Sequence, residues 1–303
     1  MRIAASAASI DSSRVRGMAG LVAVVTDSTA YLPADLVTKH AIAVVTLQVI
    51  IGGRPLAEGI EADSGRVARA LRAGEVVTTS RPAPAAFARL YRDLHRSGAS
   101  SVVSVHLSGE ISGTVDAARS AAAEVAGDGV YVEVVDSRSL GMGLGYAVLA
   151  AAAESAAGAD AARVAEAAAR RALESSTFLY VDTLEYLRRG GRIGAAQAFL
   201  GSALAVKPLL HLVDGRLEPL DRVRTRDRAL TRLVRAAVET AGTAPVDLAV
   251  HHLAASPTAV QIAGVLRGQV PGAHEVLVVE VGAVVGAHVG PGMLAVVVSP
   301  RTG

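Results

Sequence analysis

The alternation of short apolar runs with helix-like segments is the feature of this sequence that most constrains its fold. Several of the segments between the runs begin with Pro or Ser, and Ser64 is expected to cap one of these helices. Parallel strands need a crossover connection, so this alternation is typical of βαβ units and a mostly parallel sheet. In the first half of the chain, strands are expected at 21–25, 42–50, 76–77, 102–107 and 130–135, and helices at 33–39, 64–73, 84–97, 114–126 and 141–157.

The second half of the chain changes character after a charged connector helix at 160–173. Asp214-Gly215 is a hairpin signal between two apolar runs, which is not expected inside a parallel α/β unit. We expect strands at 177–181, 207–210, 217–223, 246–250, 275–281 and 294–298, and helices at 184–187, 195–205, 226–241 and 258–267.

A chain of 303 residues exceeds what one core usually organises, so two domains are expected. The predicted fold class is α/β, with an N-terminal domain at 20–174 whose mostly parallel sheet is flanked by helices. A C-terminal α+β domain is expected at 175–303. Residues 1–19 lack a proper hydrophobic block and are predicted to be a disordered extension.

Composition and charge exclude several classes of function. The formal net charge is +2, which is too near neutrality to indicate a nucleic-acid partner. The chain has no cysteine, so a thiolate nucleophile and a Cys-ligated metal are excluded, and a reducing cytoplasm is the expected location. The apolar stretch at 141–157 is interrupted by glycines and ends near acids, so we expect a buried helix and no stable membrane insertion.

Four predicted strands end in loops rich in hydroxyl groups or aspartate. The carboxyl ends of parallel strands form the ligand crevice of an open sheet, and helix N-termini that follow them favour an anion. Ser, Thr and Asp at such places are also ordinary helix caps, although three consecutive hydroxyls at 78–80 exceed what capping needs. The loops contain Asp27-Ser28, Thr79-Ser80, Ser108 with Ser112, and Asp136-Ser137.

A glycine-rich stretch at 282–291 carries a single histidine, His288, among small residues. Its glycines let the backbone turn sharply or approach a ligand closely. A histidine there could donate to an anion or move a proton near neutral pH. The simpler interpretation is a glycine-rich hairpin that happens to contain a histidine.

An ordered set of short motifs resembles the DegV family of bacterial fatty-acid-binding proteins from residue 21 to the end of the chain. The motifs are Thr26-Asp27-Ser28-Thr29, Thr79-Ser80-Arg81-Pro82, Ser112-Gly113-Thr114, Asp136-Ser137, Leu187–Ile193, Lys207-Pro208, Arg222–Thr225 and His288–Gly292. The resemblance implies a two-domain α/β protein that holds one long-chain fatty acid between its domains and needs no other cofactor. It also implies a non-enzymatic role, in which the acid is presented to the catalytic subunit of a fatty acid kinase that forms an acyl-phosphate.

The resemblance also assigns roles to individual residues. The carboxylate would be held by a group of small polar residues and one imidazole: Thr79, Ser80, Ser112, Gly113, Thr114 and His288. Arg192 would lie near the mouth of the site and orient the head group or its phosphate. Arg224, also expected near the mouth, would dock the kinase.

The acyl tail needs a narrow apolar slot. A sixteen-carbon chain buries about fourteen methylenes at about 0.8 kcal/mol each, or roughly 11 kcal/mol before the costs of ordering and desolvation. Phe199, Leu200, Leu204 and Val206 could line the slot opposite the helix at 141–153, although each is also an ordinary core residue.

Two positions depart from the pattern of the family. Arg81 stands where the family usually has Gln, which adds a positive charge near the mouth. Glu110, in Ser108-Gly109-Glu110-Ile111, lies close to a site meant for an anion and is expected to face solvent or to pair with Arg81. Acyl chain length, the identity of the kinase and the effect of these two residues stay open.

Two enzymatic alternatives are weaker. A Ser/His-dependent hydrolase of acyl esters could use Ser112 and His288 with Asp136 or Asp27, but the Gly-x-Ser-x-Gly elbow is absent. A nucleotide site could use the glycines at 141–145, but their spacing is not that of the dinucleotide motif, and no Gly-Lys-Ser/Thr loop exists. No metal site is expected, because His251-His252 would alternate across a strand.

Overall fold

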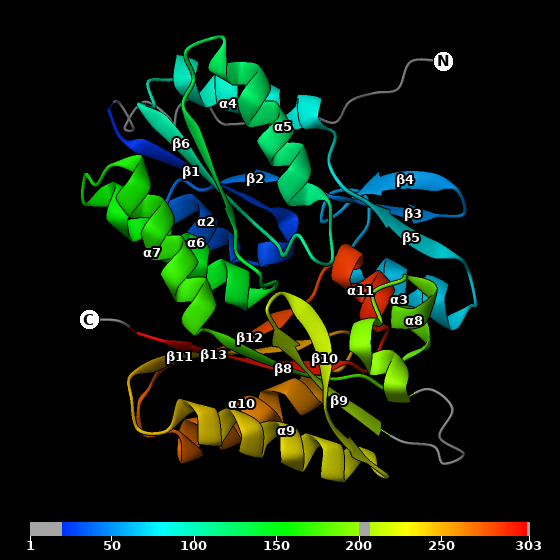
Figure 1. Cartoon of the computed structure of the whole chain (residues 1–303). Helices are drawn as coiled ribbons and strands as arrows, with labels where there is room; N and C mark the ends of the chain where they lie inside the picture. The colour runs from blue at the N-terminus through cyan, green and yellow to red at the C-terminus, as the bar shows by residue number, and fades with distance from the viewer. Residues whose placement is uncertain (1–19, 200–206, 302–303) are drawn as a thin grey trace.

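The chain folds into two large sheets that lie on either side of a pair of helices, with a small third sheet at one side (Figure 1). The structure is a computed structural model that describes residues 20–199 and 207–301. The predicted fold class is confirmed, since a helix-flanked parallel sheet precedes a separate, mostly antiparallel C-terminal sheet. The predicted extension at 1–19 lies outside the described residues.

The N-terminal sheet has four parallel strands, and both of its faces are covered by helices. Val22 and Val24 of the first strand pack toward α6 and α7, whereas Ala23 and Val25 pack toward α4 and α5. This alternation is the period of two that a strand imposes on its side chains. The strands, in spatial order, are β2 (Ala43–Val45), β1 (Val22–Asp27), β6 (Ser101–His106) and β7 (Val132–Asp136). The helices are α4 (Pro84–Arg96), α5 (Thr114–Ala126), α6 (Met142–Ala156) and α7 (Ala161–Glu174).

A small antiparallel sheet projects from this domain, and its presence shows that two predictions, for residues 42–50 and 78–80, were wrong. The run at 42–50 is not one strand, because β2 joins the parallel sheet and the chain then crosses to the small sheet at Gln48. The hydroxyls at 78–80 lie inside a strand of the small sheet, where β-branched threonine fits well, and not in a loop after a parallel strand. The strands are β4 (Arg54–Ala57), β3 (Gln48–Ile51) and β5 (Val77–Ser80), and the helix α3 (Ser64–Arg72) follows β4. Asp63, not Ser64, caps α3 by accepting from the Arg66 N–H (2.6 Å).

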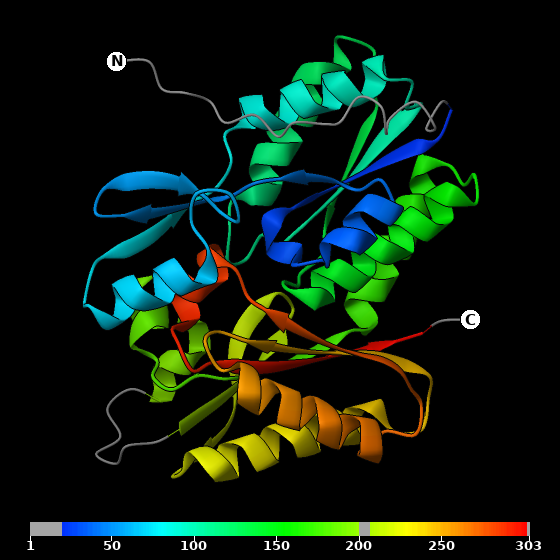
Figure 2. The same ribbon diagram turned by 180° about the vertical axis from the view of Figure 1, so that it is seen from behind.

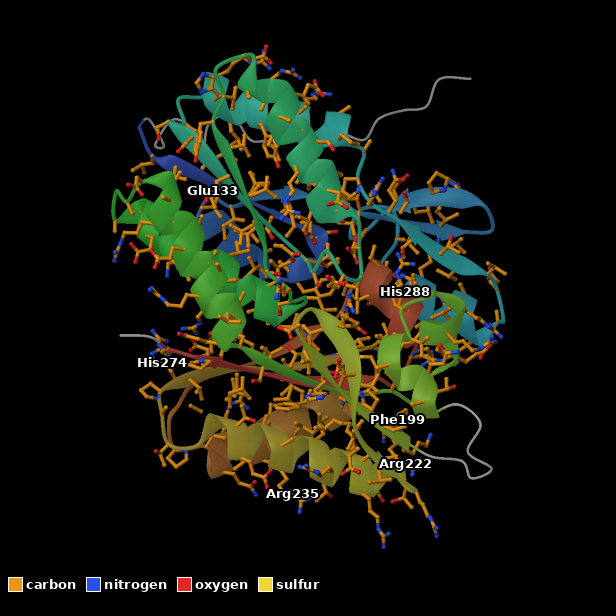
Figure 3. All side chains as sticks on the ribbon, in the orientation of Figure 1. Glu133, Phe199, Arg222, Arg235, His274 and His288 are labelled. Atoms are coloured by element: carbon orange, nitrogen blue, oxygen red, sulfur yellow. The ribbon has the colours of Figure 1, made fainter. Side chains whose placement is uncertain are left out.

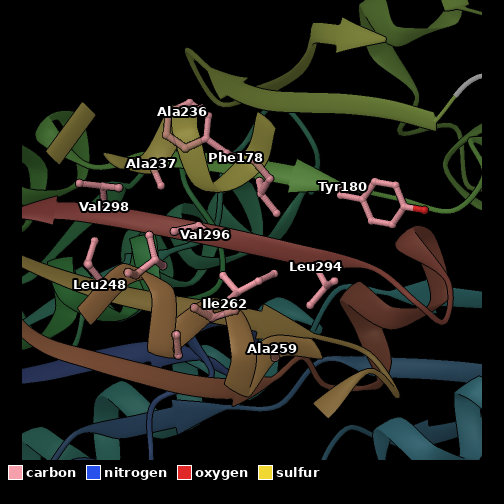
Figure 4. Close-up of a cluster of buried hydrophobic side chains, with 14 of the residues drawn as sticks. Phe178, Tyr180, Ala236, Ala237, Leu248, Ala259, Ile262, Leu294, Val296 and Val298 are labelled. Carbon is pink, nitrogen blue, oxygen red and sulfur yellow. The ribbon is translucent and has the colours of Figure 1, made fainter. Parts of the chain in front are cut away.

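The C-terminal sheet has six strands, and α9 (Arg226–Ala241) and α10 (Ser256–Gln269) cover its outer face (Figure 2). Residues of alternate strand positions, such as Leu248, Val296 and Val298, pack against Ala259 and Ile262 of α10 and against α9 (Figure 4). The hairpin predicted at Asp214-Gly215 joins two of the strands. In spatial order these are β10 (Arg216–Val223), β9 (Lys207–Val213), β8 (Ser176–Tyr180), β13 (Leu294–Pro300), β11 (Val246–His252) and β12 (Ala273–Glu280).

The inner face of the C-terminal sheet packs on α6, so this helix is buried between two sheets. Met142 and Tyr146 lie against Ala249 and Val297, and the Tyr146 hydroxyl donates to the Leu248 carbonyl (2.9 Å). A helix enclosed on both sides is apolar all round, which confirms the buried helix expected here. Within 20–199 and 207–301, no helix combines the length and the apolar character that crossing a bilayer requires.

Short helical elements connect these layers at the junction of the domains. The glycine-rich stretch that contains His288 is not a hairpin, because it forms a helix whose Val284 N–H donates to buried Glu58 (2.7 Å). The apolar helix predicted at 195–205 is a 3-10 helix as far as Phe199, and residues 200–206, with Leu200, Leu204 and Val206, lie outside the described residues. The elements are η1 (Ser28–Ala30), α2 (Ala34–Lys39), α8 (Glu185–Arg189), η2 (Gly194–Phe199) and α11 (Ala283–Val289).

Candidate functional site

A cavity of about 220 Å³ lies where β5, the start of α5, the turn after α8 and α11 meet. Thr79, Ser112 and His288, which are far apart in the sequence, all line it, as the sequence motifs predict. Figure 3 shows His288 at the junction between the small sheet and the C-terminal domain. The polar lining residues are Thr79, Ser80, Arg81, Ser112, Gly113, Arg192 and His288, and the apolar ones are Leu47, Leu107, Ile111, Leu140, Leu187, Leu217, Val284, Val285 and Val289.

The imidazole of His288 is neutral and bonded to the hydroxyl of Thr79. Burial, with a smaller contribution from the positive charge of Arg192, lowers the pKa of His288 to about 4. Its Nε2 lies 2.8 Å from Thr79 Oγ1, and its buried Nδ1 has no hydrogen-bond partner among the described residues. An unpaired buried donor is rarer than an unpaired acceptor, which favours the tautomer with the proton on Nε2. In that tautomer His288 donates to Thr79, and the Thr79 hydroxyl is left free to donate into the cavity.

The turn after α8 fixes the position of the imidazole. A Cβ built on Gly190 would lie 2.1 Å from His288 Nδ1, so only glycine allows the ring to lie this close. A Cβ on Gly290, directly after α11, would lie 2.1 Å from the ring of Tyr186 on α8. These two close contacts fix the position of α11 relative to α8. The sequence Gly190-Gly191 does not by itself indicate such a contact.

The charged groups that line the cavity are both cationic. Arg192 donates from Nε to the Ile111 carbonyl (3.1 Å) and from Nη1 to the Gly190 carbonyl (2.6 Å), so it links the loop before α5 to the turn after α8. A guanidinium has five N–H donors, and the other three have no partner among the described residues. Arg81 packs over Gly113, where a Cβ would lie 2.1 Å from its Nη1.

Glu110 is exposed, which agrees with the first of its two expected positions, and it neither lines the cavity nor pairs with Arg81. It forms an ion pair with Arg216 of β10, with Nε of the arginine 2.7 Å from Oε2. The neighbouring Ser108 hydroxyl donates to the Gly215 carbonyl in the same hairpin (2.8 Å). Glu110 therefore links the β9–β10 hairpin to the N-terminal domain through its ion pair with Arg216. Its negative charge lies outside the cationic cavity.

The other predicted site residues have different positions. Thr114 is fully buried and bonded to Ser112, with 2.9 Å between the two hydroxyl oxygens, so it supports Ser112 and does not line the cavity. Arg224 follows β10 at the end remote from Gly215, roughly 25 Å along the strand at about 3.3 Å per residue. Figure 3 shows Arg222, two residues earlier, on the far side of the C-terminal domain from His288. Arg224 is therefore not beside Arg192 at the mouth.

A second, smaller cavity of about 40 Å³ adjoins the first and shares lining residues with it. We call it the slot, and it shares Leu140, Leu217, Val285 and Val289 with the polar cavity. Its remaining lining residues are Tyr31, Gly141, Thr177, Leu179, Leu212, His251, Val281, Met293 and Ala295. The helix start at Gly141 was expected here, but Phe199 is not among the lining residues of either cavity. The inward faces of β8 and β13 were missed, because in sequence they resemble ordinary core.

A Ser–His–Asp triad with His288 is not assembled. Asp136 accepts from the backbone N–H of Arg138 (2.9 Å), and Asp27 accepts from His106 Nδ1 (3.0 Å). Since His288 Nδ1 has no partner among the described residues, it lacks the carboxylate that would orient it as a base.

A different Ser–His–Asp chain exists in the core of the N-terminal domain. Ser104 Oγ lies 2.7 Å from His106 Nε2 and 2.8 Å from the Tyr91 hydroxyl, and His106 in turn contacts Asp27. All of these groups are fully buried, and the ring of Phe87 covers His106 at a centroid distance of 5.1 Å. No substrate reaches Ser104, so the chain is a structural network and not a catalytic one.

The lowered pKa of His288 predicts a specific dependence of stability on pH. Below pH 6.5 the unfolded chain takes up a proton at this residue and the folded chain does not, so the free energy of unfolding falls until about pH 4. In His288→Gln this contribution is absent. We expect the stability difference between wild type and variant to shift by up to about 2 kcal/mol in favour of the variant from pH 7 to pH 5. Urea titrations at both pH values measure it, and a constant difference would contradict the neutral, buried imidazole.

Comparison with known proteins identifies relatives over nearly the whole chain. A family model described as an uncharacterised protein of the DegV family matches residues 21–301. A DegV domain-containing protein from Streptomyces coelicolor is 55% identical over 280 residues, which are 92% of this chain and 99% of that protein. Protein DegV from Bacillus subtilis is 35% identical over 279 residues, which are 91% of this chain and 98% of that protein.

Solved structures agree with these relatives. A fatty-acid-binding DegV family protein from Thermus thermophilus superimposes with a TM-score of 0.86 at 35% identity, covering 93% of this chain and 100% of that one. DegV from Bacillus subtilis, described as a fatty acid binding protein, gives a TM-score of 0.85 at 32% identity, covering 93% and 99%. The resemblance predicted from the ordered motifs is confirmed.

Proposed function

The chain belongs to the DegV family, and on this premise we propose that it binds one long-chain fatty acid between its two domains. The observation that carries the proposal is that a polar, cationic cavity lies directly beside an apolar slot and shares lining residues with it. A fatty acid has the same two parts, a carboxylate and an alkyl chain. Two related proteins of known structure are described as binding fatty acids.

The carboxylate is proposed to lie in the polar cavity. The hydroxyls of Thr79 and Ser112 supply neutral donors there, and Arg192 supplies a charged one. The Ser80 hydroxyl donates to the Arg81 carbonyl (3.2 Å) and would have to turn to join them. His288 acts through Thr79, because a neutral Nε2–H that donates to the Thr79 oxygen leaves the Thr79 proton for the ligand. Hydrogen bonds to a charged group are worth about 1.5–3 kcal/mol each, which offsets the desolvation of the carboxylate.

The alkyl chain is proposed to occupy the slot. Small-molecule pockets usually measure about 300–1,000 Å³, and the polar cavity and slot, at about 220 and 40 Å³, are smaller. The slot must therefore widen when a chain enters, and the shared residues Leu140 and Leu217 stand at the passage that has to open.

Mass spectrometry of the purified protein tests the binding proposal. Under native conditions the protein should carry an added mass equal to one fatty acid, and the same acid should appear free after denaturation. Protein stripped of lipid should regain the mass and gain thermal stability when the acid is added, because a ligand that binds only the folded state stabilises it. A stripped protein that neither binds nor responds to long-chain acids would overturn the proposal.

Displacing the imidazole of His288 by mutating a neighbour should weaken fatty-acid binding. Gly190 has a φ of −75°, which alanine adopts easily, so Gly190→Ala acts mainly through the contact of its Cβ with the imidazole, with a milder contact at 3.2 Å to the Tyr186 carbonyl. We expect about a tenfold loss of fatty-acid affinity, the equivalent of one lost hydrogen bond to a charged group, measured by calorimetry. Gly264→Ala, in the middle of α10 with open space around its Cβ, is the matched control and should bind normally. Equal affinities for the two variants would show that the position of His288 is unimportant.

Presentation of the bound acid to a separate kinase is the second part of the proposal. The chain has no phosphate-binding Gly-Lys-Ser/Thr loop, so the phosphoryl group would come from the catalytic subunit of a fatty acid kinase. Arg81 and Arg192 are exposed at the cavity, where a phosphorylated head group would emerge.

Arg224 is proposed to dock that kinase and not to touch the lipid. Arg224→Ala should retain the fatty acid and lower the rate of acyl-phosphate formation with the kinase added, by about fivefold for one contact at an interface. Parallel measurements of bound lipid and of turnover separate these effects. Loss of lipid in this variant, or unchanged turnover, would refute the docking role.

A further inference from the structure

The slot contains one polar side chain with nothing to bind. Thr177, the second residue of β8, lines the slot, and its hydroxyl is buried without a hydrogen-bond partner among the described residues. A buried hydroxyl in this condition is uncommon, because it has lost water without replacement. Valine has the same shape and would satisfy the packing of β8 without that cost, so packing alone does not explain a threonine here.

The other polar side chains of the slot are already occupied. His251 accepts at Nε2 from the Met142 N–H (2.8 Å) and, in that tautomer, donates from Nδ1 to the Val279 carbonyl (3.2 Å). The Tyr31 hydroxyl donates to Glu58 (3.1 Å) and accepts from the Val285 N–H (3.2 Å). Within the described part of the chain, Thr177 is therefore the slot's single side chain with free hydrogen-bonding capacity.

Water is a poor partner for this hydroxyl. A buried water normally makes about three hydrogen bonds, and Thr177 is the one side chain of the slot's described lining that could supply one. The slot's free volume, about 40 Å³, could admit a water, so the lack of further side-chain partners and not the size of the slot argues against one. The natural partner is thus an oxygen carried into the slot by the ligand itself.

We propose that the slot recognises long-chain acids that carry a hydroxyl or keto oxygen on the part of the chain lying beside Thr177. This inference rests on the proposed function and specifies the class of acid. A plain alkyl chain leaves the Thr177 hydroxyl without a hydrogen bond. An oxygenated chain forms one with it, and this bond offsets the desolvation cost of the ligand's oxygen. Thr177 is thus a specificity-determining residue for the middle or tail of the chain, separate from the groups that hold the carboxylate.

A positional series of ligands tests the inference. Lipid-free protein is titrated with hexadecanoic acid and with hexadecanoic acids hydroxylated near the carboxylate, at mid-chain or at the terminal carbon. We compare wild type with Thr177→Val, and with Thr243→Val, an exposed change in the turn after α9, as the matched control. At one chain position, the hydroxylated acid should lose about tenfold in affinity in Thr177→Val, while hexadecanoic acid binds that variant equally or more tightly.

The outcomes separate this inference from the proposed function. The inference fails if wild type binds all the acids with no positional preference, or if Thr177→Val weakens the binding of every acid equally. In either case the slot does not recognise an oxygen on the acyl chain, and the proposal of fatty-acid binding still stands. If the lipid-free wild type binds none of the acids, both fail. A gain in thermal stability of ligand-free Thr177→Val would further support an unpaired hydroxyl kept for a ligand.

Discussion

Ala295→Phe should strongly weaken the binding of a long acyl chain while leaving the polar cavity in place. Ala295 is on β13, is 4% exposed and points into the slot, where the free volume is about 40 Å³. A phenyl ring at this position fills that space. If it excludes four methylenes, the loss is about 3 kcal/mol, or roughly 200-fold in affinity. Calorimetry with hexadecanoic acid measures the loss.

The chain-length dependence distinguishes a blocked slot from a damaged protein. An eight-carbon acid depends least on the depth of the slot, so it should bind the variant almost as it binds wild type. Overpacking a core typically costs 1–3 kcal/mol, so the thermal midpoint of the variant must be recorded as well. Ala295→Leu is a milder version, and Val296→Leu, on the next residue and the opposite face of the strand, is the control for added bulk alone. Equal losses for short and long acids would rule out the slot as the site of the tail.

Local signals in the sequence were sufficient where neighbouring residues decide the structure. The helix at Arg226–Ala241 has the predicted bounds because Thr225 caps it and Gly242 ends it with a positive φ. The Asp214-Gly215 hairpin is likewise set by two residues that both adopt a positive φ. Neither feature depends on the rest of the molecule.

Predictions were wrong where distant contacts decide the structure. The apolar run at 42–50 does not indicate that its two ends pair with different sheets. The glycine-rich segment around His288 is helical because Val284, Val285 and Val289 are buried and Glu58, more than two hundred residues away in sequence, binds its first turn. Glycine content alone argues against a helix, and tertiary packing overrides it.

The site was predictable in its polar half and not in its apolar half. Hydroxyls and a lone histidine are conspicuous in a sequence that is 51% hydrophobic, so Thr79, Ser112 and His288 could be grouped before their positions were known. The slot is lined by Leu179, Met293 and similar residues that differ from core residues only in the direction they face. That direction depends on how the C-terminal sheet packs on α6, which no local pattern records.

The largest effect on stability is expected from Asp27→Asn, although Asp27 lies outside both the polar cavity and the slot. Its fully buried carboxylate accepts four hydrogen bonds, from the N–H and hydroxyl of Thr29, from the Leu107 N–H and from His106 Nδ1. An asparagine of the same shape replaces one acceptor oxygen with an NH₂ group. In either orientation of the amide, that group faces an N–H donor, and a buried donor is left unpaired.

Breaking a buried charged network typically costs about 3–5 kcal/mol, so the free energy of unfolding of Asp27→Asn should fall by about that much. Asp136→Asn is the matched control, because Asp136 is less buried and accepts from backbone N–H groups at the surface. It should cost less than about 1 kcal/mol. Bound fatty acid in the folded fraction of Asp27→Asn should stay close to that of wild type, since Asp27, Ser104 and His106 line neither the polar cavity nor the slot and reach them only through the backbone of Leu107. If Asp27→Asn instead kept its stability and lost a chemical activity on acyl esters, the buried Ser–His–Asp chain would have to be reconsidered as a catalytic group that opens to solvent.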